Sequence, residues 1–146
     1  MKKIYFAGGW FSPEQDEQHT RLYELLAKEK NLQIFNPRTA GEFQVGPSTD
    51  HMTNVFIGNT DAIDECHLVV AITDYKDMGT IWECGYAYAT KKPIIYYCET
   101  LGDKPFNLML AKTGRVARTE LELMQLLTES HSYSFRKVHS FDGNVE

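Results

Sequence analysis

The sequence predicts an α/β fold in which helices cover both faces of one parallel sheet. Segments typical of strands alternate with segments typical of helices, and this alternation builds parallel sheets with right-handed crossovers. Residues 67–72, His-Leu-Val-Val-Ala-Ile, have the length and the branched side chains of a buried parallel strand. With 146 residues and 42% hydrophobic positions, the chain is sized for one domain, residues 1–146, with one core.

The N-terminal elements follow from local signals. A first strand is expected at about residues 3–7, followed by a Gly-Gly-Trp-Phe turn at residues 8–11. Residues 12–15, Ser-Pro-Glu-Gln, predict a helix start, because Ser is a preferred cap, Pro suits the first helical position and Gln follows the cap by three residues. We expect this helix to run to about Lys30, with one buried stripe made by Leu22, Leu25 and Leu26.

The remaining chain continues the alternation. A short strand at residues 32–35 leads into a stretch rich in Gly, Pro and polar residues, 39–50, which predicts a long functional loop. After it we expect a helix over 49–65, the strand at 67–72, a helix beginning near Thr80, a strand over 93–98, a helical segment over 105–112, an extended piece over 115–117 and an amphipathic helix over 119–128.

Composition argues against several classes of function. The net charge of −5 and the scattered 15 Lys and Arg residues disfavour a nucleic-acid polymer as partner. The three cysteines and five histidines lack the spacing of a metal site, so no metal is expected and the cysteines are expected to be reduced thiols of a cytoplasmic protein. Residues 1–7 resemble the start of a signal peptide, but Gly8-Gly9 breaks the apolar run and no apolar stretch reaches about 18 residues. We therefore expect neither export nor membrane insertion.

Two carboxylates occur where the strand at 67–72 meets the next helix. Ligands of open α/β sheets bind beyond the carboxyl ends of the strands, so Asp77 and Glu83 are candidate site residues. Residues 80–83 also fit a capping box, in which Glu83 would only bind the amide of Thr80, and Asp77 also suits a turn or a helix cap. In the first turn of a helix Glu83 would be kept ionised, as attack on an anomeric carbon requires.

The aromatic residues near the first strand allow two interpretations. The turn at residues 8–11 is not a GxGxxG motif and no Walker lysine follows, so we expect no dinucleotide cofactor. Trp10 and Phe11 are either core residues or a wall on which a flat base stacks. Tyr86 and Tyr88 lie two apart on the expected helix and are predicted to be packing residues.

Four separated segments make the chain resemble the nucleoside 2-deoxyribosyltransferases. They are residues 4–11, Ile-Tyr-Phe-Ala-Gly-Gly-Trp-Phe; the Gln44 loop; residues 77–89 with the pattern D-x-G-T-x-x-E-x-G-Y-A; and residues 104–109, Lys-Pro-Phe-Asn-Leu-Met. The resemblance implies a single-domain, flavodoxin- or Rossmann-like three-layer sandwich with a mainly parallel five-stranded sheet of order 2-1-3-4-5. It also implies that the tail, residues 130–146, packs on a neighbouring subunit.

The resemblance further implies a role for particular residues. Glu83 would be the nucleophile that takes up the 2-deoxyribosyl group, Asp77 would contact the base and assist its proton transfer, and Tyr5 would hold the nucleophile. Gln44 would approach the base, while Asn107 would reach the sugar hydroxyl in the site of an adjoining subunit. The other substrate-binding positions carried over from the resemblance are Gly9, Trp10, Phe11, Asn59, Gly79 and Met109.

One departure from the family pattern precedes the strand at 67–72. Many relatives have Asp in an N-D-L-x-x-I stretch, whereas this chain has Gly-Asn-Thr-Asp-Ala-Ile at residues 58–63, which puts Asn59 in the place of the carboxylate. An amide donates and accepts hydrogen bonds but cannot carry a proton between base and solvent. Base preference and the group that protonates the leaving base therefore stay open, with Asp61 a less favoured substitute.

The activity implied by the resemblance is exchange of nucleobases on 2'-deoxynucleosides, in nucleotide salvage, by a retaining double displacement. Deoxynucleosides and free nucleobases would be the partners, with no cofactor or metal. A homo-oligomer is expected, built from dimers, and hexamers are usual in the family. Two alternatives are hydrolysis of deoxynucleosides or their 5'-monophosphates, for which the sequence shows no evident basic cluster, and a non-catalytic nucleotide-binding module.

Overall fold

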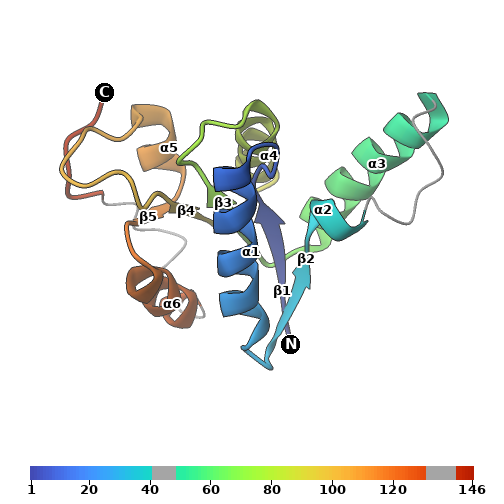
Figure 1. The fold of residues 1–146 in the computed structure, drawn as a ribbon, viewed down its shortest axis with the longest axis horizontal. Coiled ribbons are helices and arrows are strands. Elements are labelled where there is room, and N and C mark those ends of the chain that lie inside the picture. Colours follow the sequence, from blue (N-terminus) through green and yellow to red (C-terminus); the bar gives the residue numbers. More distant parts are fainter. Residues whose placement is uncertain (41–48, 131–140) are drawn as a thin grey trace.

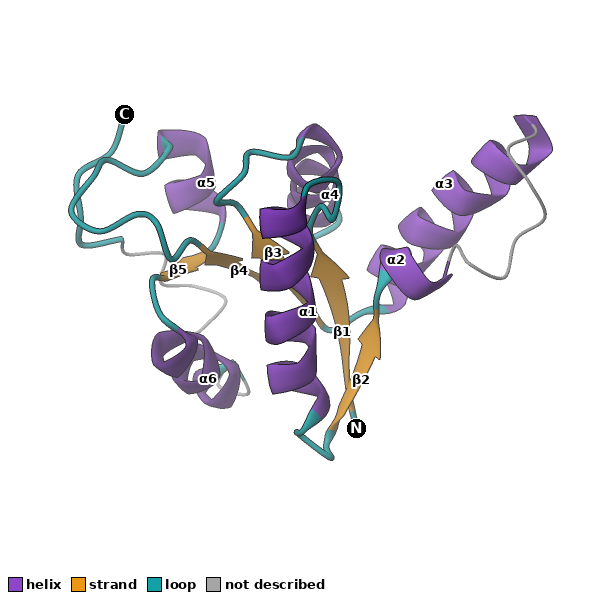
Figure 2. Ribbon diagram, in the orientation of Figure 1, coloured by secondary structure: helices purple, strands orange, loops and turns teal. Residues whose placement is uncertain are grey.

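The computed structural model describes residues 1–40, 49–130 and 141–146 (Figure 1). Five strands form one sheet: β1 (Lys2–Ala7), β2 (Leu32–Phe35), β3 (Leu68–Ile72), β4 (Ile94–Tyr97) and β5 (Arg115–Ala117). The helices are α1 (Pro13–Ala27), α2 (Pro37–Ala40), α3 (Thr49–Glu65), α4 (Met78–Ala89), α5 (Leu108–Thr113) and α6 (Glu120–Glu129). The strands pair in parallel in the order β2-β1-β3-β4-β5 (Figure 2), which confirms the predicted fold class and strand order.

The two faces of the sheet carry separate apolar clusters. Alternate residues of a strand point to opposite faces, and in β1 Ile4 and Phe6 pack with α1 and α6 while Tyr5 and Ala7 pack with α3, α4 and α5. Helix α1 lies in front of the sheet in Figure 1. All five residues of β3 are buried, because this central strand is covered from both sides. The predicted three-layer arrangement is present.

Helix α1 begins as expected and ends earlier than expected. The side chain of Ser12 accepts a hydrogen bond from the amide of Gln15 at 3.1 Å, and the side chain of Gln15 accepts one from the amide of Phe11 at 2.9 Å. The helix ends at Ala27 rather than near Lys30, because the chain turns there and the Glu29 amide bonds back to the Leu26 carbonyl. Gln15 thereby ties the turn after β1 to the helix.

The exposure of two aromatic residues corrects one prediction and excludes one interpretation. Tyr88 is 55% exposed, so its prediction as a packing residue is wrong, and Phe11 is 72% exposed, which excludes the core interpretation of this residue. Tyr88 lies on the solvent side of α4, whereas Tyr86 is half-buried, stacks on Trp82 with ring centroids 5.6 Å apart and donates to the carboxylate of Asp64. Because they are two residues apart on a helix, the two tyrosines do point in different directions. Tyr86 meets Asp64 of α3, whereas Tyr88 points to solvent.

The C-terminal segment pairs with its own chain. Phe106 and Val145 form an isolated parallel bridge, the Leu108 amide donates to the Glu146 carbonyl at 2.8 Å, and Phe141 packs on Phe106 with ring centroids 5.8 Å apart. Of the tail predicted to pack on a neighbouring subunit, residues 131–140 lie outside the described residues. Contact of this tail with a neighbour stays a prediction. Among the described helices, none is long and apolar enough to cross a membrane.

Candidate active site

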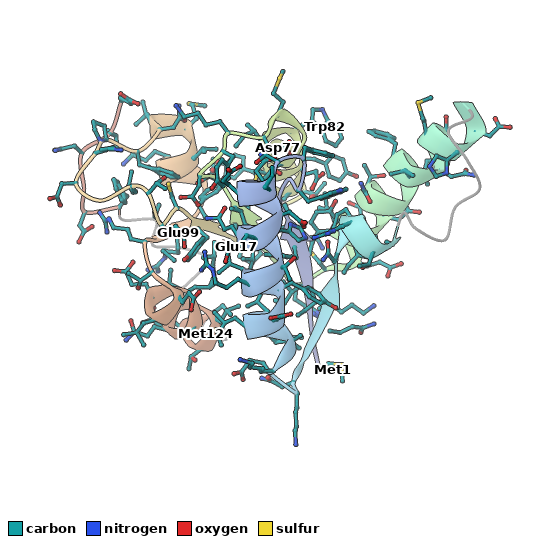
Figure 3. All side chains as sticks on the ribbon, viewed as in Figure 1. Met1, Glu17, Asp77, Trp82, Glu99 and Met124 are labelled. Carbon is teal, nitrogen blue, oxygen red and sulfur yellow. The ribbon has the colours of Figure 1, made fainter. Side chains whose placement is uncertain are left out.

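The loops that follow β1 and β3 meet at the point where the chain direction across the sheet reverses. Helix α1 follows β1 on one face and α4 follows β3 on the other, so the crevice between these strands is the switch point at which open α/β sheets bind ligands. A Cβ atom added to Gly9 would lie 3.3 Å from the carboxylate carbon of Asp77. The two predicted loops are therefore in contact, and Asp77 and Trp82 both lie at this end of the molecule (Figure 3).

Asp77 is the cap of α4. Its Oδ2 accepts hydrogen bonds from the amide of Thr80 at 2.9 Å and from the hydroxyl of Thr80 at 2.8 Å. The helix consequently begins at Met78, two residues before the predicted start, and the capping box of residues 80–83 does not form. The structural interpretation of Asp77 is correct, while that of Glu83 is wrong, because the Thr80 amide is already satisfied.

Glu83 occupies the second turn of α4, beyond the amides at the start of the helix. The expectation that these amides hold it ionised is therefore wrong, since the effect fades within the first turn. Oε2 of Glu83 is buried without a hydrogen-bond partner. Burial raises the pKa of Glu83 to about 7, with the negative charge of Asp77 acting in the same direction and Tyr5 acting against it.

Tyr5 interacts with the Glu83 carboxylate and lowers its pKa. Its side chain is fully buried in β1, and burial together with Glu83 raises its pKa far above the ordinary value, so the hydroxyl keeps its proton. The hydroxyl and Oε2 of Glu83 fall outside good hydrogen-bond geometry, yet Tyr5 acts as a donor that lowers the pKa of Glu83.

The remaining predicted site residues spread over several elements. Trp10 is half-buried beside Phe11, with ring centroids 4.9 Å apart, and Gly79 is exposed in the first turn of α4. Asn59 is half-buried on α3, one turn before Ile63, which packs in the same cluster as Tyr5. Gln44 lies outside the described residues. The structure thus brings together Gly9, Asp77, Glu83 and Tyr5, with Trp10 next to Gly9 on the same turn.

Asn107 and Met109 stand apart from this group, at the exposed start of α5. The Asn107 side-chain oxygen accepts from the amides of Met109 at 3.0 Å and Leu110 at 3.3 Å, so Asn107 is a helix cap. Its amide nitrogen keeps two donors for another molecule. The structure describes no contact between either residue and Glu83, and the predicted role of Asn107 in an adjoining subunit stays a prediction.

Sequence reasoning missed a set of polar residues on α1 and after β2 and β3. Gln18 and His19 are buried on the inner side of α1, where Gln18 donates to Asp74 at 2.8 Å and His19 bonds to Asn36 at 3.1 Å. The available signal was position, since His19 lies three residues before the buried Leu22. In the part of the chain that the structure describes, no three His, Cys, Asp or Glu residues gather where they could hold a metal ion.

Fold and site together define an open α/β domain with a pair of carboxylates at its switch point, one of which has a buried oxygen atom. A family model described as nucleoside 2-deoxyribosyltransferase matches residues 4–120. The chain belongs to that family, as its resemblance predicts. A comparison with curated proteins finds no match.

Solved structures of similar fold include a 2-deoxyribosyltransferase of Bacillus psychrosaccharolyticus. It is 27% identical, with a TM-score of 0.71, and the match covers 82% of this chain and 90% of that chain. A conserved protein of Enterococcus faecalis is 19% identical with a TM-score of 0.70, covering 88% of this chain and 98% of that one. A CMP N-glycosidase of Clostridium botulinum is 22% identical with a TM-score of 0.57, covering 88% and 99%. The last two likenesses bear on the fold alone.

Proposed function

We propose that this protein transfers 2-deoxyribose between nucleobases, with Glu83 as the nucleophile. The observation that carries the proposal is the buried Oε2 of Glu83, which has no hydrogen-bond partner and lies in the crevice that also holds Asp77. A buried carboxylate without a partner costs stability, and such groups are retained where they do chemistry. A pKa near 7 lets Glu83 be ionised in neutral solution while it stays reactive.

The reaction proceeds in two displacements. An oxygen of ionised Glu83 attacks C1' of the deoxynucleoside, the bond from C1' to the base nitrogen breaks, and the base leaves with the bonding electrons and takes up a proton. A second base then attacks C1' from the face that the first base left, loses its own proton and releases the carboxylate. Two inversions give net retention. The transition state has oxocarbenium character, so the adjacent anion stabilises it as positive charge develops.

Two side chains support the nucleophile in this proposal. Asp77, fixed as a helix cap through Oδ2, keeps Oδ1 for the base and assists its proton transfer. Tyr5 stays protonated and donates to Glu83, which orients the carboxylate and favours its ionised form. In the oligomer that we expect, Asn107 of a neighbour would bind a sugar hydroxyl.

The charges of the described residues favour a nucleoside over a nucleoside 5'-monophosphate. Three arginines are paired with carboxylates of the same chain: Arg21 with Glu17, Glu99 and Glu120, Arg38 with Asp16, and Arg118 with Asp142. Glu17 belongs to α1, and Glu99 lies next to it in Figure 3. A phosphate would compete with these carboxylates for a bidentate arginine. We therefore propose unphosphorylated deoxynucleosides as substrates.

Base exchange distinguishes the candidate activities directly. The protein is incubated with deoxyinosine or thymidine and a free acceptor base, and the products are separated by chromatography. A new deoxynucleoside supports transfer, free base without new nucleoside indicates hydrolysis, and unchanged substrate indicates binding alone. Glu83→Gln should abolish turnover, whereas Glu24→Gln on the exposed side of α1 should not.

Covalent labelling tests the nucleophile itself. A slow fluorinated deoxynucleoside should leave its sugar on the peptide that contains Glu83, as detected by mass spectrometry after digestion. A label on any other residue, or none, would contradict the assignment.

A further inference from the structure

The imidazole of His19 is buried beneath the predicted base-binding turn and has no part in the proposed displacement. Its side chain is 1% exposed. The ring contacts Phe6 of β1, with centroids 4.8 Å apart, and meets the indole of Trp10 edge-on, with centroids 5.7 Å apart and planes at 69°. Trp10 therefore rests on a ring that the core holds in place.

The hydrogen bond between His19 and Asn36 defines which nitrogen of the imidazole carries the proton. Nε2 lies 3.1 Å from Oδ1 of Asn36, and the same oxygen accepts the amide of Arg38 at 3.1 Å. A backbone amide can only donate, so this atom is an acceptor and Nε2 must be the donor. His19 is thus held in the tautomer with the proton on Nε2, and its Nδ1 is an acceptor.

Asn36 connects His19 to the start of α2. The Asn36 carbonyl accepts from the amide of Thr39 at 3.1 Å and from that of Ala40 at 3.0 Å, while its side chain accepts from Arg38. These are the bonds of a helix cap. One buried imidazole therefore contacts both the turn after β1 and the cap of the short helix after β2.

The glycines of the turn lie against the other edge of the ring. A Cβ atom added to Gly8 would stand 3.3 Å from Nδ1, which is buried and has no hydrogen-bond partner among the described atoms. Burial lowers the pKa of His19, as does the charge of Arg38, whereas Asn36, Asp16 and the Gly9 backbone act in the opposite direction. The ring is neutral at pH 7.

We propose that His19 is a positioning residue, which fixes the indole of Trp10 relative to Asn36 and thereby presents a preformed wall to a flat nucleobase. The inference deepens the proposed function and rests on it. An indole that is fixed before binding avoids the entropic cost of ordering a mobile side chain when the base binds. Loss of this fixation should therefore weaken base binding and leave the bond-breaking step unchanged.

Two substitutions separate the contacts of His19. His19→Phe keeps a ring against Trp10 and removes the donor to Asn36, and His19→Gln keeps an amide donor near the place of Nε2. We expect His19→Phe to raise the KM for the acceptor base about fivefold, the worth of one lost hydrogen bond, with kcat within about twofold of wild type. His19→Gln should lie closer to wild type.

The fold of each variant is checked by its circular dichroism and melting temperature. If His19→Phe does not fold, Asn36→Ala removes the same hydrogen bond together with the bond to the Arg38 amide, and it should raise the KM at least as much. Unchanged KM values would overturn the proposal, and so would a loss of kcat at unchanged KM.

Tryptophan fluorescence provides a readout that needs no turnover. The chain has two tryptophans, and Trp82→Phe, on the outer side of α4, leaves Trp10 alone. Because an imidazolium in contact with an indole quenches its emission, Trp10 emission should fall as the pH drops through the lowered pKa of His19. His19→Phe should abolish this titration, and an identical titration in both proteins would overturn the contact.

The outcomes for the two proposals are separable. Addition of free adenine should change Trp10 emission, and the apparent affinity should be lower in the His19→Phe variant. If this holds while the wild type exchanges no bases, the positioning role stands and the proposed function fails. If the wild type exchanges bases and adenine binds both proteins equally, the positioning role fails and the proposed function stands.

Discussion

Gly9 faces the carboxylate of Asp77 across the switch point of the sheet, although the two residues are far apart in the chain. A Cβ atom added to Gly9 would stand 3.3 Å from both Cγ and Oδ1 of Asp77, and 3.2 Å from Nε2 of Gln15. Gln15 holds the Phe11 amide, so a side chain at position 9 disturbs both the turn and the carboxylate. A side chain at position 9 would therefore have to displace Asp77 or Gln15 by a few tenths of an ångström.

Gly9→Ala should lower kcat/KM by about tenfold or more, because misplacing a group at the reacting centre by a few tenths of an ångström weakens its action. The matched control is Gly58→Ala in α3, where an added Cβ meets nothing within 4 Å. That change should leave activity intact and raise the free energy of unfolding by about 1 kcal/mol, the helix preference of Ala over Gly. Equal kinetics for both variants would contradict the close contact.

The pH profile of the free enzyme should show one acidic limb set by Glu83. The nucleophile must be ionised, and its pKa is about 7, so kcat/KM should fall tenfold per pH unit well below that value. Initial rates measured from pH 5 to 9, in buffers of constant ionic strength, check this prediction. A limb near the ordinary carboxylate value of about 4.5 would show that burial does not control the group.

Substitutions of the neighbours should move that limb in opposite directions. Asp77→Asn removes a negative charge that raises the pKa of Glu83 and keeps a side chain able to cap α4, so the limb should shift to lower pH. Tyr5→Phe removes the donor that lowers this pKa, so the limb should shift to higher pH. Both profiles are compared at saturating and limiting substrate. Shifts of the same sign would refute the assigned interactions.

Glu83→Gln should stabilise the protein in alkaline solution. The pKa of Glu83 is raised on folding, so its protonated form favours the folded state below about pH 4.5, and that contribution is lost as the pH rises through about 7. The neutral amide avoids this loss. Urea denaturation should show a gain on the order of 3 kcal/mol at pH 8, shrinking towards zero at pH 4.5.

Mixing two inactive variants tests whether Asn107 serves a neighbouring site. Glu83→Gln and Asn107→Ala subunits, unfolded together and refolded, should form hybrids in which one site has both wild-type groups. In symmetric dimers that assemble at random, about a quarter of full activity should return. The singly refolded variants are the controls. Recovery would fail if Asn107 acted only within its own chain or not at all.

Much of the fold followed from periodicity, and the reasons for the exceptions are local. The strand at residues 68–72 is so apolar that no other assignment competes with it. Ser12 and Pro13 clearly mark the start of α1. The start of α4 was predicted two residues late because Thr80 and Asp77 both suit a cap. Asp77 prevails because its carboxylate accepts from both the amide and the hydroxyl of Thr80.

Candidate site residues were accessible to sequence reasoning where they belong to a motif. Asp77 and Glu83 share one strand-to-helix junction, whereas His19 and Asn36 meet only after α1 folds over β1 and β2. No spacing along the chain encodes that meeting. The raised pKa of Glu83 was also beyond the sequence, because it depends on burial in the folded chain rather than on position in the helix.

Val145 and Glu146 pair with the backbone on both sides of Asn107, the cap of α5. The Glu146 amide and carbonyl bond to Phe106 and Leu108 on either side of that asparagine, at 3.0 and 2.8 Å. Removal of Val145 and Glu146 would leave both groups without these partners and would loosen the position of the asparagine between them. Protein with and without these two residues would migrate alike on a gel, so the intact mass should be verified before specific activities are compared.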